Sequence, residues 1–139
     1  MKTSLHSYIS FNGNASEAIE FYRSVFDGKV TSNTFGDFAE SMPSAPEDKD
    51  KIIHAFIKND KGVEFMLSDM PSSMTYSDGQ RVTLCLDGED EAALRVYWDR
   101  LTVDGKIEVP FEKAPWGDTY GALTDKFGVN WMINVGKAE

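Results

Sequence analysis

Several residue types are scarce in this chain of 139 residues, and each scarcity excludes a class of protein. The single cysteine, Cys85, can form neither an internal disulfide nor a zinc cluster, and it favours the reducing cytoplasm as the compartment. No apolar run approaches the ~18 residues of a membrane span, and residues 1–6 contain no apolar signal core. We therefore expect a cytoplasmic protein without a membrane partner.

Positive charge and glycine-rich loops are also scarce. The 14 Lys and Arg residues face 23 Asp and Glu residues, and the net charge of −9 argues against a nucleic-acid partner. No G-x-G-x-x-G loop is present to hold a phosphate group or to begin a methyl-donor site, so no cofactor of these kinds is predicted. With 41% hydrophobic and 12% aromatic residues, the chain can nevertheless fill a packed core, and its length suits one domain over residues 1–139.

The first half of the chain has the periodicity of a strand, a helix and three further strands. The strands are expected at residues 5–11, 29–35, 51–58 and 63–68, with the helix between Asn14 and Asp27. Asn14 and Glu17 have the spacing of a capping box at the start of this helix. The polar stretch 36–51 is predicted to be a loop, and residues 59–62 a tight hairpin turn.

The same order of elements is predicted again in the second half. Strands are expected at 81–86, 106–111, 120–124 and 130–135, and a helix lies between the first two. Phe21-Tyr22 of the first helix matches Tyr97-Trp98 of the second, 76 positions later. We therefore predict an α+β fold of two βαβββ modules, at about 1–70 and 80–139, whose curled mixed sheets surround a cavity.

The sequence resembles the vicinal oxygen chelate (glyoxalase/bleomycin resistance/dioxygenase) superfamily, and within it the PhnB-like proteins, a subgroup often labelled as demethylubiquinone methyltransferase-like. The matching pieces follow one another over nearly the whole chain: residues 8–11, 18–26, 54–55, 66–69, 116–121 and 125–131. The resemblance implies a glyoxalase-like βαβββ repeat, a homodimer and a site within each curled sheet. The chain lacks the glycine loop of a methyl-donor site, so the label does not predict methyl transfer.

Enzymes of this superfamily bind a divalent metal with one residue from each of four strands, commonly His, Glu, His and Glu. Carried over to this sequence, the resemblance offers His6 and Glu64 at the first two positions, but Arg81 and Met132 at the others. Arginine does not ligate metals, and methionine is a poor ligand for hard cations. His6 and Glu64 thus remain weak metal candidates, and the sequence predicts no full metal site.

The two histidines each allow a functional and a structural interpretation. His6 shares a strand face with Tyr8, so the two are predicted to line the cavity, where His6 would shuttle protons or bind ligand. The alternative is an edge-strand histidine that only forms a hydrogen bond. His54 is either a second cavity histidine or a buried one that is satisfied by a backbone carbonyl.

Glu64 and Arg81 form the sharpest functional hypothesis. A guanidinium near Glu64 would put a fixed positive charge where relatives hold a metal, and its two parallel donors suit a carboxylate, phosphate or phosphonate. The alternatives are a structural salt bridge and, for Glu64 alone, a carboxylate that takes a substrate proton.

Three other residues are weighed as candidates. Trp116 either stacks on a flat ligand or packs within its loop. Asp69 is expected to cap the turn that follows its strand, and Cys85 to be a small core residue rather than a nucleophile.

The sequence therefore predicts a protein that binds a small, anionic ligand without a metal, through His6, Tyr8, His54, Glu64, Arg81 and Trp116. The first alternative is a divalent-metal lyase, isomerase or oxygenase that uses His6, Glu64 and His54. The second is a dimeric structural or regulatory protein with a vestigial cavity.

Overall fold

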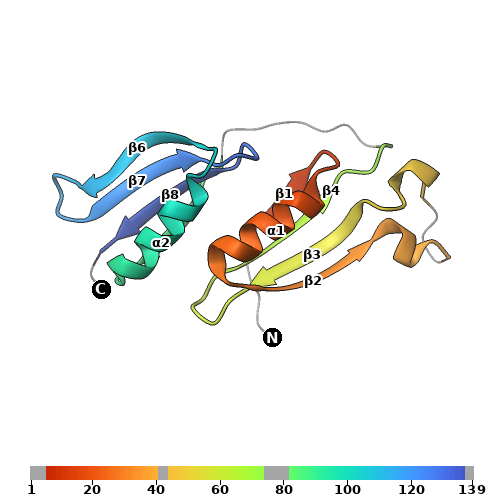
Figure 1. The fold of residues 1–139 in the computed structure, drawn as a ribbon, viewed down its shortest axis with the longest axis horizontal. Helices are drawn as coiled ribbons and strands as arrows, with labels where there is room; N and C mark the ends of the chain where they lie inside the picture. The colour runs from red at the N-terminus through yellow and green to blue at the C-terminus, as the bar shows by residue number, and fades with distance from the viewer. Residues whose placement is uncertain (1–5, 41–43, 74–81, 137–139) are drawn as a thin grey trace. The chain divides into compact units, whose positions relative to one another are not determined.

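The computed structural model describes residues 6–40, 44–73 and 82–136. The chain divides into two compact units, Met1–Asp78 and Gly79–Glu139. Each unit contains one four-stranded sheet and one α-helix (Figure 1). Arg81 lies outside the described residues.

The first unit is a mixed sheet with one helix on one face. Along the chain it contains β1 (Tyr8–Phe11), α1 (Ala15–Phe26), β2 (Lys29–Thr34), the 3-10 helices η1 (Phe35–Phe38) and η2 (Pro46–Asp48), β3 (Ile52–Lys58) and β4 (Glu64–Asp69). The strand order is β1-β4-β3-β2. β1 and β4 are parallel, and the other neighbours are antiparallel.

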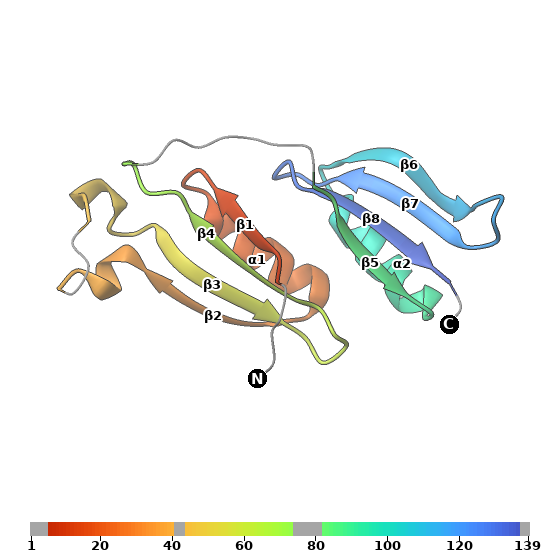
Figure 2. The ribbon, with the colours of Figure 1, turned by 180° about the vertical axis from the view of Figure 1, so that it is seen from behind.

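The second unit repeats this topology. It contains β5 (Leu84–Gly88), α2 (Glu91–Leu101), β6 (Lys106–Lys113), β7 (Thr119–Thr124) and β8 (Asn130–Val135), in the order β5-β8-β7-β6. The predicted α+β class and the two βαβββ modules are thereby confirmed. Neither sheet is strongly curled, and each is a twisted open sheet (Figure 2). Four strands are too few for one sheet to close on itself, since small closed barrels use about eight.

Aromatic side chains fill the core between each helix and its sheet. In the first unit, the Phe65 ring lies 5.4 Å from that of Tyr22 and 5.9 Å from that of Phe26, both with edge contacts. In the second, Trp98 of α2 stacks on Phe111 at 5.1 Å. These contacts leave the opposite face of each sheet without a helix.

The repeat extends to individual atoms in the hairpin turns. The Asn59 side-chain oxygen accepts the backbone N–H groups of Lys61 and Val63, at 2.9 and 3.1 Å. Asp125 accepts those of Phe127 and Val129 in the same way, at 2.8 and 3.1 Å. The two turns have the same length, so the register of β3 with β4 can be compared directly with that of β7 with β8.

Three local predictions were wrong. The Asn14 side chain forms no cap at the start of α1, and its backbone (φ −111°, ψ 20°) is not in the extended conformation typical of a capping residue. The first helical N–H, that of Ala15, donates to Asp69. Asp69 therefore does not cap the turn after its own strand, and its carboxylate joins three other segments of the first unit. Cys85 is exposed and not in the core, because alternation along β5 puts it on the sheet face away from α2.

Candidate functional site

Figure 2 shows the helix-free face of the first sheet from its open side. Four of the residues singled out from the sequence lie on it: His6, Tyr8, His54 and Glu64. Strand register orders this face into three rows that run across the sheet. From β1 to β2, the rows are His6–Glu64–Lys58–Lys29, Tyr8–Met66–Phe56–Thr31, and Ser10–Ser68–His54–Asn33. We call them the charged, apolar and distal rows.

In the charged row, His6 and Glu64 form a pair. The His6 Nδ1 atom lies 3.5 Å from the Glu64 Oε1 atom, and the two side chains are 30% and 48% exposed. This geometry directs Nδ1 of the imidazole toward the carboxylate and leaves Nε2 for another partner. The pair combines a proton donor and acceptor that a ligand in solvent can reach.

Tyr8 and His54 form a second contact on this face. Their ring centroids are 6.1 Å apart, with the planes tilted by 45°. His54 lies in the distal row, opposite Asn33 of β2, and four residues of strand separate that row from Glu64. At ~3.3 Å per residue this is about 13 Å, so His54 and the His6–Glu64 pair lie at opposite ends of the face.

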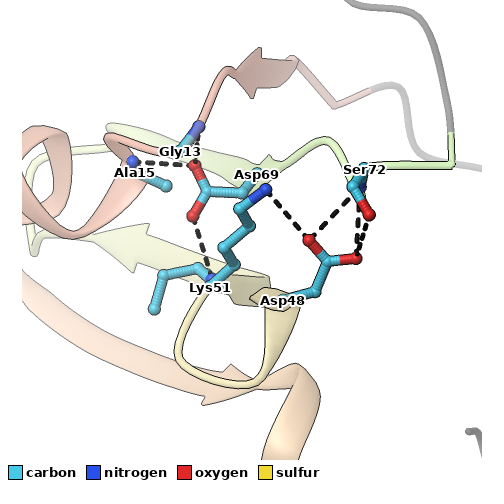
Figure 3. A network of polar contacts seen from close by, with 7 residues as sticks. Gly13, Ala15, Asp48, Lys51, Asp69 and Ser72 are labelled. Carbon is cyan, nitrogen blue, oxygen red and sulfur yellow. Dashed lines mark hydrogen bonds and ion pairs between the residues drawn. The ribbon is translucent and has the colours of Figure 1, made fainter. Parts of the chain in front are cut away.

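A buried polar network holds the end of β4 beside this face (Figure 3). Asp69 is 3% exposed, and its carboxylate accepts the backbone N–H groups of Gly13 and Ala15 at 2.9 Å and of Ile52 at 3.0 Å. One side chain thus fixes the start of α1 and the start of β3 against the end of β4.

Asp48 is the second buried carboxylate in Figure 3. It pairs with the Lys51 Nζ atom at 2.9 Å and accepts both the N–H and the hydroxyl of Ser72, at 3.1 and 3.0 Å. The hydrogen bond from Lys51 lowers the pKa of the Asp48 carboxyl, the two bonds from Ser72 add to this, and burial opposes them. Sequence reasoning had treated residues 36–51 as a plain loop and missed this anchor.

The remaining candidates are in the second unit or outside the described residues. Trp116 is in the turn between β6 and β7 and is exposed. Arg81 cannot be placed, so its predicted contact with Glu64 stays a prediction. Lys29 and Lys58 were not singled out from the sequence. Lys58 pairs with Glu64 across the hairpin, and Lys29 pairs with Lys58, so both share the face of Glu64.

The described residues do not fit the superfamily's four-ligand metal set. Lys58 pairs with Glu64 across the first hairpin turn, and Thr124 pairs with Asn130 across the second. Glu64 and Asn130 therefore occupy equivalent positions after the two turns. Within the repeat, Asn130 is therefore the counterpart of Glu64, and Met132 that of Met66. The assignment of Met132 to the fourth ligand position rests on the resemblance and stays a prediction. An amide is a weaker metal ligand than the carboxylate of the superfamily set. Within the described ranges, no three His, Cys, Asp or Glu side chains are grouped so that they could hold a metal ion.

Comparison with known proteins identifies the family. The model of the Glyoxalase/Bleomycin resistance protein/Dioxygenase superfamily matches residues 4–133. The chain belongs to this superfamily. Protein YjdN of Escherichia coli (strain K12), a relative of this glyoxalase-superfamily chain, is 37% identical over 145 residues, 97% of each chain.

Two solved structures extend the glyoxalase-superfamily assignment to the fold. PA1353 from Pseudomonas aeruginosa has a TM-score of 0.84 and 27% identity, covering 99% of this chain and 100% of that one. The PhnB protein from Bacillus cereus has a TM-score of 0.75 and 26% identity, covering 96% and 100%. These likenesses confirm the predicted PhnB-like resemblance.

Neither described helix is long and apolar enough to cross a bilayer.

Proposed function

We propose that the chain binds a small anionic ligand against the helix-free face of its first sheet, without a bound metal ion. The observation that carries this proposal is the accessible His6–Glu64 pair, 3.5 Å apart, at one edge of that face. His6 Nε2 contacts the ligand, and Glu64 orients the imidazole through Nδ1.

The charged row favours an anion although the chain as a whole has a net charge of −9. Lys58 is opposite Glu64, and Lys29 is opposite Lys58, so two lysines share the row with one carboxylate.

The apolar row gives the rest of the ligand a surface. Tyr8, Met66 and Phe56 are aligned across three neighbouring strands, and Tyr8 is half exposed. Aromatic rings and a thioether on a sheet accept a flat or aliphatic group. A ligand with an anionic head beside Lys58 and an apolar body over Tyr8 matches both rows.

The second candidate function is a divalent-metal lyase, isomerase or oxygenase that uses His6, Glu64 and His54. The close approach of His6 to Glu64 favours it. The separation of about 13 Å along the strands between the rows of Glu64 and His54 argues against one shared ion, because metal–ligand bonds to N and O are about 2 Å long.

Thermal unfolding with a panel of small carboxylates, phosphates and phosphonates tests the proposal, with each compound measured with and without EDTA. A ligand that binds only the folded chain raises the Tm by mass action. We expect at least one compound to raise the Tm equally in both conditions, and His6→Ala to remove that increment. Glu20→Gln, which breaks an exposed pair with Arg23 on α1, is the matched control. We expect this variant to keep the increment in Tm.

Two results would contradict the proposal. If no compound in the panel changes the Tm, the face binds no such anion. If the increment appears only with added Mn²⁺, Ni²⁺, Zn²⁺ or Fe²⁺ and disappears with EDTA, the metal-dependent candidate is favoured instead.

A further inference from the structure

Trp116 and Tyr120 form an exposed aromatic pair in the second unit, which the proposed function does not use. Trp116 is 65% exposed, whereas Trp98 is 6% and Trp131 2% exposed. The Trp116 and Tyr120 ring centroids are 5.8 Å apart, with the planes tilted by 60°. The two rings therefore form a corner and do not stack face to face.

Trp116 belongs to the turn between β6 and β7, which two backbone hydrogen bonds close. Figure 1 shows this turn. The Gly117 N–H donates to the Ala114 carbonyl at 3.0 Å, and the Ala114 N–H donates to the Asp118 carbonyl at 2.7 Å. Gly117 has a φ of 105°, which favours glycine over residues with a side chain. The backbone of the turn thus holds Trp116 at the surface without help from the core.

Two carboxylates bind Asn134, the residue opposite Tyr120. The Asn134 side-chain nitrogen donates to Asp87 Oδ1 at 3.2 Å and to Asp118 Oδ2 at 3.1 Å. Strand register puts Asn134 directly opposite Tyr120 on one side and Asp87 on the other. Because the amide is neutral, it holds the two carboxylates together without cancelling their charge.

From these positions, we infer that the second unit binds a small organic cation, of the protonated-amine or quaternary-ammonium class, in the corner between Trp116 and Tyr120. Indole and phenol faces attract such cations through their quadrupole, and tryptophan does so most strongly. The Asp87 and Asp118 carboxylates add a Coulomb attraction and repel anions. This site consists of residues of the second unit, whereas the proposed anion site consists of residues of the first, and the two ligands have opposite charges.

Titration of the ¹⁵N-labelled full chain with choline, followed by NMR, tests this inference. We expect saturable shifts of the Trp116 indole N–H signal and of the backbone amides of residues 117–120, with unchanged Trp98 and Trp131 indole signals. The neutral isostere 3,3-dimethylbutan-1-ol is expected to bind at least about tenfold more weakly, the size of a cation–π contact.

Variants separate the aromatic contribution from the charged one. Trp116→Leu and Asp118→Asn are each expected to weaken choline binding by about five- to tenfold, measured on the amides of residues 119 and 120. Asp99→Asn, an exposed carboxylate on α2, is the control and leaves binding unchanged. Equal binding of the neutral isostere, or wild-type affinity in Trp116→Leu, would overturn the inference. Because Trp116 is outside the core, its variant is expected to keep the wild-type Tm, which confirms that folding is intact.

Discussion

Asp69 and Ala15 are 54 residues apart in the chain, yet the Ala15 backbone N–H donates to the Asp69 carboxylate at 2.9 Å. The helix α1 therefore receives its N-terminal cap from the end of β4. The same carboxylate accepts the N–H groups of Gly13 and Ile52, so one buried side chain coordinates a loop, a helix and a strand. The fold of the first unit therefore depends on Asp69 far more than on the residues next to it.

Replacing Asp69 by Asn is expected to destabilise the chain by about 2–3 kcal/mol, because an amide NH₂ cannot accept one of the three N–H groups and leaves it unsatisfied in the interior. Urea denaturation measures this loss as a lower midpoint. The exposed carboxylate Asp60 serves as control, with Asp60→Asn expected to change the free energy of unfolding by less than about 0.5 kcal/mol. Equal effects of the two substitutions would contradict this role of Asp69.

Asp48 gives the chain a pH-dependent anchor. The hydrogen bond from Lys51 lowers its pKa in the folded state, so the folded chain binds fewer protons at this site than the unfolded chain. Its stabilisation is thus fully present above the unfolded pKa of about 3.9 and is lost as the pH falls through the lower folded value. We expect Asp48→Asn to reduce stability at pH 7, and the difference from wild type to narrow below about pH 4. Asp50→Asn, an exposed neighbour, should show no such narrowing.

The two hairpin turns are equivalent, but their surroundings demand different side chains. The Asn59 NH₂ group donates to the Phe26 carbonyl at 3.1 Å, whereas Asp125 accepts the Trp131 indole N–H at 2.9 Å. Asn59→Asp would place a carboxylate opposite the Phe26 carbonyl, so that two acceptors face each other. Asp125→Asn can place an amide NH₂ opposite the Trp131 indole N–H, so that two donors face each other. Each swap is expected to cost about 1–3 kcal/mol in chemical denaturation, although both residues form the turn equally well. If neither substitution changed the free energy of unfolding, only the hydrogen bonds within the turn would contribute to stability, which would contradict this account.

Cys85 combines exposure with low reactivity. Partial desolvation against the sheet raises the pKa of its thiol, and the nearby Asp87 carboxylate raises it further. At pH 8 we therefore expect slower alkylation by iodoacetamide than for a model thiol, because the thiolate is the nucleophile. Asp87→Asn is expected to increase the rate about two- to threefold. A wild-type rate equal to that of the model thiol would contradict this account.

Most of the fold follows from local patterns in the sequence. The repeat was predictable because the Tyr22 and Trp98 stripes are local helical patterns, and because each hairpin has its own turn residues. The cap of α1 was not predictable in the same way, since Asn14 has the correct local chemistry but Asp69 is brought to Ala15 only by the parallel pairing of β1 with β4. Cys85 was misjudged because an apolar residue in a strand suggests burial, whereas only the face that packs on α2 is buried.

The candidate site was predictable in part. His6, Tyr8 and Glu64 share a face through strand alternation alone, and the structure brings His6 and Glu64 to 3.5 Å. His54 is on the same face but in another row, a separation that depends on the register between β3 and β4 and not on any pattern within one strand.

The central claim is that a small anion binds beside His6 and Glu64 without a metal ion. NMR titration of the ¹⁵N-labelled chain in EDTA, with the strongest compound of the anion panel, tests it most directly. The account predicts saturable amide shifts at residues 6–8, 58 and 64–66, and their loss in His6→Ala. Shifts confined to other residues, or shifts that occur only after a divalent metal is restored, would contradict it.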